Sequence, residues 1–109
     1  MKQTSCVVVL TTCPNRTVAR RIATALVTKR LAACVNLLPG IESTFRWEGK
    51  IDRANEVLLV IKTTRRRFGA LARAIKHLHP YEVPEIIALP VTIGAAPYLR
   101  WLSQSVALR

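Results

Sequence analysis

The pattern of hydrophobic and polar positions changes period several times along the chain, and each change marks the border of a predicted element. Residues 5–12 are β-branched and continuously apolar, which is typical of a central strand covered on both faces. Over residues 14–30, apolar side chains recur at helical spacing and basic ones occupy most of the other side. This predicts an amphipathic helix with Pro14 in its first turn, where a missing N–H costs nothing. Residues 31–38 are predicted to form a second strand.

The middle of the chain alternates strictly between two kinds of side chain. After Pro39-Gly40, residues 41–47 place Ile, Ser, Phe and Trp at the odd positions and mainly charged or polar residues at the even ones. This period of two indicates a half-buried strand. Glu48-Gly49 is a reasonable hairpin signal, and residues 51–63 return as a long strand.

The last third of the chain completes the pattern. Apolar spacing predicts a second amphipathic helix over residues 65–78, ended by Pro80. Residues 85–93 form a predicted fourth strand whose Pro90 requires an edge or a bulge, and residues 98–102 begin a short final helix. The order β-α-β-β-α-β plus a helix predicts an α+β, ferredoxin-like sandwich, as a single domain over residues 1–109.

The predicted hairpin is too long for the rest of the domain to cover. Strands over about 32–47 and 50–63 would span roughly 45–50 Å, whereas a domain of this size has a radius of gyration near ~13 Å. Its distal half nevertheless carries Ile41, Phe45 and Trp47. Because exposed apolar edges invite pairing with another chain, we expect the hairpin to build an oligomer. A kink at Pro39-Gly40 that folds the hairpin back on its own domain is the alternative.

Composition limits the class of protein. The net charge is +11 with only six acidic residues, which favours an anionic partner such as nucleic acid, a phosphorylated small molecule or an acidic protein surface, or else a merely solvated basic surface. Cysteines at positions 6, 13 and 34 are odd in number and lack C-x-x-C spacing, which argues against a disulfide framework and a zinc ribbon. No apolar run approaches the ~20 residues of a membrane helix, and the polar start lacks a signal peptide's layout, so we expect a cytoplasmic protein without membrane contact.

Five sequence blocks, in order, carry a family resemblance. They are T-T-C-P at 11–14, K-R-L-A-A-C-V-N-L-L-P-G-I-E-S at 29–43, W-E-G-K-I at 47–51, L-V-I-K-T-T at 59–64 and H-P-Y-E-V-P-E-I-I at 79–87. From about Val7 to Trp101 the chain resembles the CutA family, which is associated with tolerance of divalent cations such as copper. The resemblance implies a ferredoxin-like fold, a tight homotrimer with hairpins paired between subunits, and similarity to the PII signalling proteins.

The H-P-Y-E-V-P-E run is the first candidate site. His79 ends a predicted helix, and neutral imidazole is a good ligand for copper, zinc or nickel. Tyr81, Glu82 and Glu85 follow in a run that two prolines hold extended, which suits a ligand pocket. In the alternative interpretation His79 caps the helix, and the run is a structural turn at a subunit contact.

Cys13 is the second candidate metal ligand. It precedes Pro14 at a predicted helix N-terminus, where the dipole would lower the thiol pKa, although it can equally be a small residue that tolerates the turn. The family resemblance associates copper with a cysteine at the end of the first strand, and Thr11 holds that position here. Only His79 matches the family's histidine cleanly, because His77 lies two residues back and points away on a helix.

An anion pocket between subunits is a third possibility. Lys62, Thr63 and Thr64 end the third predicted strand and would join Trp47 and Lys50 of a neighbouring subunit around a small anionic ligand. Arg65-Arg66-Arg67 opposes the dipole of the helix that it begins, which suggests a phosphate or acidic partner. The alternatives are an ordinary edge-strand surface and a solvated basic turn.

No catalytic constellation appears, whether a Ser-His-Asp set, paired carboxylates in an apolar site or a phosphate loop, so we expect a protein that is not an enzyme. A small enzyme with Cys13 as nucleophile and His79 as base is one alternative. A basic nucleic-acid-binding module is another. RNA-binding sheets use exposed aromatics on central strands, however, and Cys6–Leu10 and Val57–Ile61 hold none, so the sequence does not favour nucleic acid.

Overall fold

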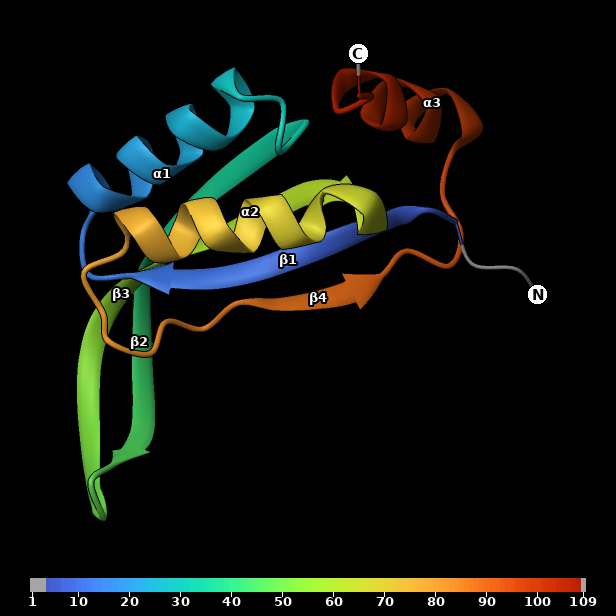
Figure 1. The fold of residues 1–109 in the computed structure, drawn as a ribbon. Coiled ribbons are helices and arrows are strands. Elements are labelled where there is room, and N and C mark those ends of the chain that lie inside the picture. The colour runs from blue at the N-terminus through green and yellow to red at the C-terminus, as the bar shows by residue number, and fades with distance from the viewer. Residues whose placement is uncertain (1–3, 109) are drawn as a thin grey trace.

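The computed structural model describes residues 4–108 and contains one antiparallel sheet, with two helices packed together against it and a third at one end (Figure 1). The elements are β1 (Cys6–Cys13), α1 (Arg16–Thr28), β2 (Cys34–Trp47), β3 (Lys50–Thr64), α2 (Arg65–Leu78), β4 (Ile87–Pro90) and α3 (Ala96–Ser105). The strand order is β2-β3-β1-β4 with antiparallel neighbours, which confirms the α+β, ferredoxin-like prediction. Within residues 4–108 no helix is long and apolar enough to span a membrane.

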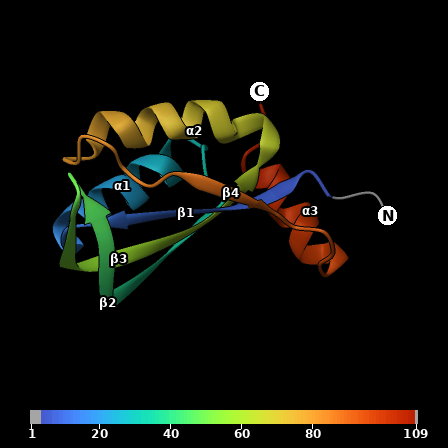
Figure 2. The same cartoon turned by 90° about the horizontal axis from the view of Figure 1, so that it is seen from below.

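The core lies between the sheet and helices α1 and α2. Figure 2 shows these two helices together on one side of the sheet. Because side chains alternate along a strand, the odd-numbered residues of β1 and those of β3 from Val57 onward face these helices and are buried. They pack against Ile22 and Leu26 of α1 and Leu71 and Ile75 of α2. The even-numbered face of β1 was also predicted to be covered, but α3 reaches it only at the Cys6 end, where the Cys6 thiol lies 3.7 Å from the Ser103 hydroxyl.

Helix α1 begins two residues later than predicted. The side chain of Asn15 accepts a hydrogen bond from the Val18 N–H at 2.9 Å and caps the helix, so Pro14 lies before the cap rather than in the first turn. At the other end, Arg30 adopts a positive φ of 57°, and the Leu31 N–H returns to the Leu26 carbonyl at 2.8 Å. The Ala32 N–H bonds to the same carbonyl, so residues 31 and 32 close the helix instead of pairing with β3, and β2 starts at Cys34 rather than at residue 31.

The β2–β3 hairpin is long and bent. Trp47 pairs with Lys50 across a two-residue turn in which Glu48 and Gly49 both have positive φ, which confirms the predicted hairpin signal. The register shifts between Leu38 and Ile41, and beyond this bulge the hairpin turns away from the helix layer (Figure 1). Pro39-Gly40 therefore bends the hairpin without folding it back onto its own helices. We call residues 41–56 the distal hairpin.

Strand β4 lies at the sheet edge, as Pro90 requires, but is shorter than the predicted 85–93. Leu10 pairs with Ile87, so a longer β4 would continue beside Thr12. The Thr12 carbonyl instead accepts a hydrogen bond from the His79 ring at 2.7 Å, which leaves residues 80–86 as a loop over that end of the sheet. Helix α3 extends further than the predicted 98–102, with Pro97 in its first turn.

Candidate functional site

A cavity of about 670 Å³ lies between the distal hairpin and the loop after α2. We call it the hairpin cleft. Its lining comes from the end of β1, both strands of the distal hairpin and the H-P-Y-E-V-P-E run, and consists of Thr12, Ser43, Thr44, Phe45, Trp47, Asp52, Glu56, Tyr81, Glu82, Val83 and Glu85. Four of the predicted ligand-pocket residues therefore meet in one place, namely Trp47, Tyr81, Glu82 and Glu85.

The His79 side chain connects the loop after α2 to strand β1 beside the hairpin cleft. Its ring lies 2.7 Å by Nε2 from the Thr12 carbonyl oxygen and accepts the Tyr81 N–H on Nδ1 at 3.1 Å. A carbonyl only accepts, so Nε2 carries the proton and the ring is the neutral tautomer. The side chain is 7% exposed, and both ring nitrogens are engaged. In this arrangement neither nitrogen is free to bind a metal, which matches the structural alternative for His79.

The Tyr81 side chain lies against the His79 ring and contacts the buried carboxylate of Glu56. Its hydroxyl donates a hydrogen bond to Glu56 Oε2 at 2.7 Å, and its ring lies 4.6 Å, centroid to centroid, from that of His79. Burial, followed by the hydrogen bond to Glu56, raises the pKa of Tyr81 above its usual range. The phenol therefore stays protonated and acts as a hydrogen-bond donor in the cleft.

Glu56 is the residue that sequence reasoning missed. Its side chain is only 7% exposed, which is rare for a glutamate, and no lysine or arginine within residues 4–108 forms an ion pair with its carboxylate. The signal for it was present, because Glu56 directly precedes the apolar run Val57–Ile61 on a strand. Its orientation toward the cleft depends on the register of β3, however, which no local pattern specifies.

The predicted thiolate at Cys13 is wrong. The side chain is fully buried in the core at the end of β1, and burial, followed by the charge of Glu56, raises the thiol pKa from its usual 9.0 to about 11. Because α1 begins only at Arg16, the thiol is not placed at the helix N-terminus. Thr11 is buried on the same face, and its hydroxyl has no hydrogen-bond partner within the described residues.

These contacts do not fit a metal held by Cys13 and His79 within one copy of the chain. The thiol holds its proton at neutral pH, and the imidazole lone pair is already used. Nowhere in residues 4–108 do three His, Cys, Asp or Glu side chains lie close enough together to hold a metal ion. The same facts leave neither group free for the nucleophile and base of the enzyme alternative. Copper binding at these residues stays a prediction.

The two predicted lysines lie outside the hairpin cleft. Lys62 is opposite Cys34 at the base of the hairpin, where its ammonium group donates to the Asn36 side chain. Lys50 is opposite Trp47 at the tip, so the two lysines are roughly 40 Å apart along β3. One copy of the chain therefore does not assemble the anion pocket, and that prediction applies only to contacts between copies.

The cleft instead gathers negative charge. Of the six acidic residues in a chain of net charge +11, four line it, and these are Asp52, Glu56, Glu82 and Glu85. No lysine or arginine is among the lining residues. Since the field inside a cleft follows the charges of its walls, this cleft attracts cations even though the molecule as a whole is basic.

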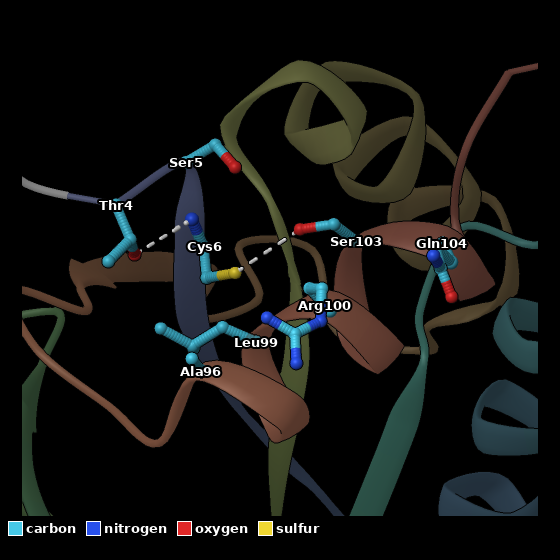
Figure 3. Close-up of a pocket in the computed structure, with 8 residues that line it drawn as sticks. All are labelled: Thr4, Ser5, Cys6, Ala96, Leu99, Arg100, Ser103 and Gln104. Carbon is cyan, nitrogen blue, oxygen red and sulfur yellow. Dashed lines mark hydrogen bonds between the residues drawn. The ribbon is translucent and has the colours of Figure 1, made fainter.

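A second, smaller cavity of about 350 Å³ lies between the start of β1 and α3. Figure 3 shows Cys6 and Ser103 facing each other there, with Leu99 and Arg100 on the α3 side. It contains no acidic residue, and Arg100 is the charged residue among its otherwise polar and apolar lining side chains.

Comparison with known proteins agrees with this architecture. Residues 7–105 match the model of the CutA1 divalent ion tolerance protein family. The chain belongs to this family. The divalent-cation tolerance protein CutA of Thermus thermophilus is 52% identical over 98 residues, which cover 90% of this chain and 95% of that protein. A solved structure of a divalent cation tolerance protein from the same organism superimposes with a TM-score of 0.92 at 50% identity and covers 94% of this chain and 99% of that one.

Membership of the family extends to longer animal proteins. Protein CutA of Mus musculus is 55% identical over 93 residues, which are 85% of this chain. These residues are only 52% of the mouse protein, so the chain spans about half the length of that relative.

Proposed function

We propose that this protein acts in divalent-cation tolerance as a homotrimer that binds a ligand and catalyses no reaction. The observation that carries the proposal is the hairpin cleft, which gathers four of the six carboxylates of a basic chain beside three aromatic side chains. A cleft with this lining is suited to binding a positively charged ligand. A signalling role of the kind that the PII resemblance implies would use occupancy of the same cleft.

The sheet supports the homotrimer. The face opposite α1 and α2 carries seven large apolar side chains from all four strands, and Leu38, Ile87 and Leu89 are 40%, 50% and 50% exposed. The seven are Val8, Leu10, Leu38, Leu58, Val60, Ile87 and Leu89. We call them the open sheet face. Contiguous apolar surface of this kind marks an interface in soluble proteins, and copies of the same chain are the partner that the family resemblance supports.

Sedimentation equilibrium tests this assembly. We expect a species of three times the 12.2 kDa chain mass. A charge in the open sheet face, Leu89→Glu, should yield monomers, because an unpaired carboxylate would be buried between copies. Val27→Glu is the matched control, since Val27 is 45% exposed on the helix side of the molecule. A monomeric wild type, or a Leu89→Glu variant that stays trimeric, would contradict the proposal.

The tolerance role is tested in cells. A bacterial host that lacks its own CutA1 protein should grow better at raised copper when it carries the wild-type chain. The Glu56→Gln variant should lose this benefit, whereas Glu42→Gln should keep it, because Glu42 is exposed on the same hairpin but outside the cleft lining. No protection by the wild type, or equal protection by Glu56→Gln, would count against the cleft as the functional site.

One observation supports a second candidate function, which is nucleic-acid binding. The layer of α1, α2 and their flanking turns contains no acidic residue and ten basic ones, which are Arg16, Arg20, Arg21, Lys29, Arg30, Arg65, Arg66, Arg67, Arg73 and Lys76. Arg67 donates to the Arg30 carbonyl and therefore also serves the fold. Filter binding of duplex DNA over a range of salt concentrations tests the idea, since phosphate contacts give a steep salt dependence and a flat, weak response would refute it.

A further inference from the structure

We propose that the ligand of the hairpin cleft is a small organic cation that carries an ammonium or guanidinium group. Glu56 would pair with the charge at the base of the cleft, and the rings of Trp47, Phe45 and Tyr81 would flank it. The inference rests on the binding role proposed above and specifies the chemical class of the ligand.

The first argument is the unpaired charge of Glu56. Its carboxylate is 7% exposed and accepts one hydrogen bond, from a phenol that itself stays neutral. Burying a carboxylate without a counter-charge is costly, and buried acids in proteins are normally paired with a cation. Within one copy of the chain the described residues provide no such cation, so a positively charged group that enters the cleft would supply the missing partner.

The second argument is the aromatic character of the wall. Phe45 and Trp47 are two residues apart on β2, so they share one face of the distal hairpin, and they are 38% and 45% exposed. Tyr81 lines the cleft from the loop after α2. The faces of aromatic rings attract ammonium and guanidinium groups, and an exposed site of this type contributes about 0.5–1 kcal/mol. Exposed rings beside carboxylates therefore suit an organic cation.

The third argument separates an organic cation from a bare metal ion and from an anion. A metal ion needs several converging donors, and residues 4–108 contain no cluster of three His, Cys, Asp or Glu that could hold one. A cavity of about 670 Å³ has the size of small-molecule sites. Anions are disfavoured because Asp52, Glu82 and Glu85 add negative charge at the cleft and no basic residue lines it.

Isothermal titration calorimetry of the intact protein at low salt tests the proposal, with agmatine as the probe because it carries both a guanidinium and an ammonium group. We expect saturable binding of agmatine and none of the neutral diol 1,4-butanediol. Glu56→Gln should weaken binding roughly tenfold or more, since it removes the charge but keeps an oxygen to accept the Tyr81 hydrogen bond. Glu42→Gln, which makes the same change outside the cleft, should bind like the wild type.

Trp47→Leu provides a second variant that does not depend on a buried residue. Trp47 lies at the exposed hairpin tip, so the variant should fold, and loss of the ring should weaken agmatine binding by about twofold to fivefold. Circular dichroism confirms folding in each case. No agmatine binding at millimolar concentration, or equal affinity in wild type and Glu56→Gln, would overturn the proposal.

A copper titration of the same samples keeps the two proposals distinct. Copper binding that Glu56→Gln abolishes, together with absent agmatine binding, would refute the organic cation and leave the cation-tolerance role standing. Agmatine binding that Glu56→Gln weakens, in a chain that confers no copper tolerance in cells, would support the organic cation and refute the tolerance role.

Discussion

The two ends of the β2–β3 hairpin have the same secondary structure and opposite roles. At the base, Leu59 and Ile61 are completely buried beneath α1 and α2. In the distal hairpin, Ile51 is 57% exposed, and the side chains that matter are acids and aromatic rings. The change from buried to exposed side chains occurs at the bulge between Leu38 and Ile41, where Ile41 pairs with Glu56 on β3. One pair of strands thus supplies stability at one end and a binding surface at the other.

Truncation of one apolar side chain at each end tests this contrast most strongly. Leu59→Ala should lower the free energy of unfolding by about 2–5 kcal/mol, because it leaves a cavity in the core. Ile51→Ala should cost less than about 0.5 kcal/mol, because the side chain is largely exposed in one copy. Urea denaturation measures both. A cost at Ile51 as large as that at Leu59 would contradict this contrast and would indicate that the distal hairpin is buried between copies.

His79 lies between the two regions, and its substitution tests whether this residue stabilises the fold or binds a metal. His79→Ala removes the hydrogen bonds to the Thr12 carbonyl and from the Tyr81 N–H, and should cost about 1–3 kcal/mol of unfolding free energy. His77→Ala is the control, because His77 is exposed on α2. Calorimetry with copper completes the experiment: unchanged stability with a large loss of copper affinity would identify His79 as a ligand instead.

Because its pKa is raised in the fold, Cys13 should make the free energy of unfolding depend on pH in the alkaline range. Its pKa is about 11 in the fold and near its usual 9.0 when unfolded, so the folded state holds the proton more tightly. The stabilisation is complete below pH 9 and is lost as the pH rises toward 11, because the unfolded chain then releases the proton first. Urea midpoints at pH 8 and pH 10.5 should differ less in Cys13→Ala than in the wild type. An equal pH dependence in both proteins would exclude this role.

The elements themselves were predictable because their signals are local. Helical spacing placed α2 at its observed limits, and Glu48-Gly49 marked the hairpin turn, since both depend on residues within a few positions of one another. Errors arose where a hydrogen bond decided a border. The Asn15 cap moved the start of α1, the Arg30 closing motif delayed β2, and the His79 bond to Thr12 stopped β4.

The candidate site was only half predictable. Tyr81, Glu82 and Glu85 were identified because they share one short and unusual run of sequence, and Trp47 because it marks the hairpin tip. Asp52 and Glu56 were missed because their approach to that run depends on strand register and on the bend at the bulge. The predicted thiolate failed for the same reason, since burial and Glu56, not the helix dipole, control the Cys13 pKa.

The sequence by itself determined the element order, the fold class, the long hairpin and the family, because periodicity and motif order are written in consecutive residues. The tertiary structure alone decided which charges meet. It brought four of six acids into one cleft of a strongly basic chain, engaged both nitrogens of His79 and buried the Cys13 thiol. Charge pairing and burial act between residues that are distant in sequence, so only the folded chain brings those residues into contact.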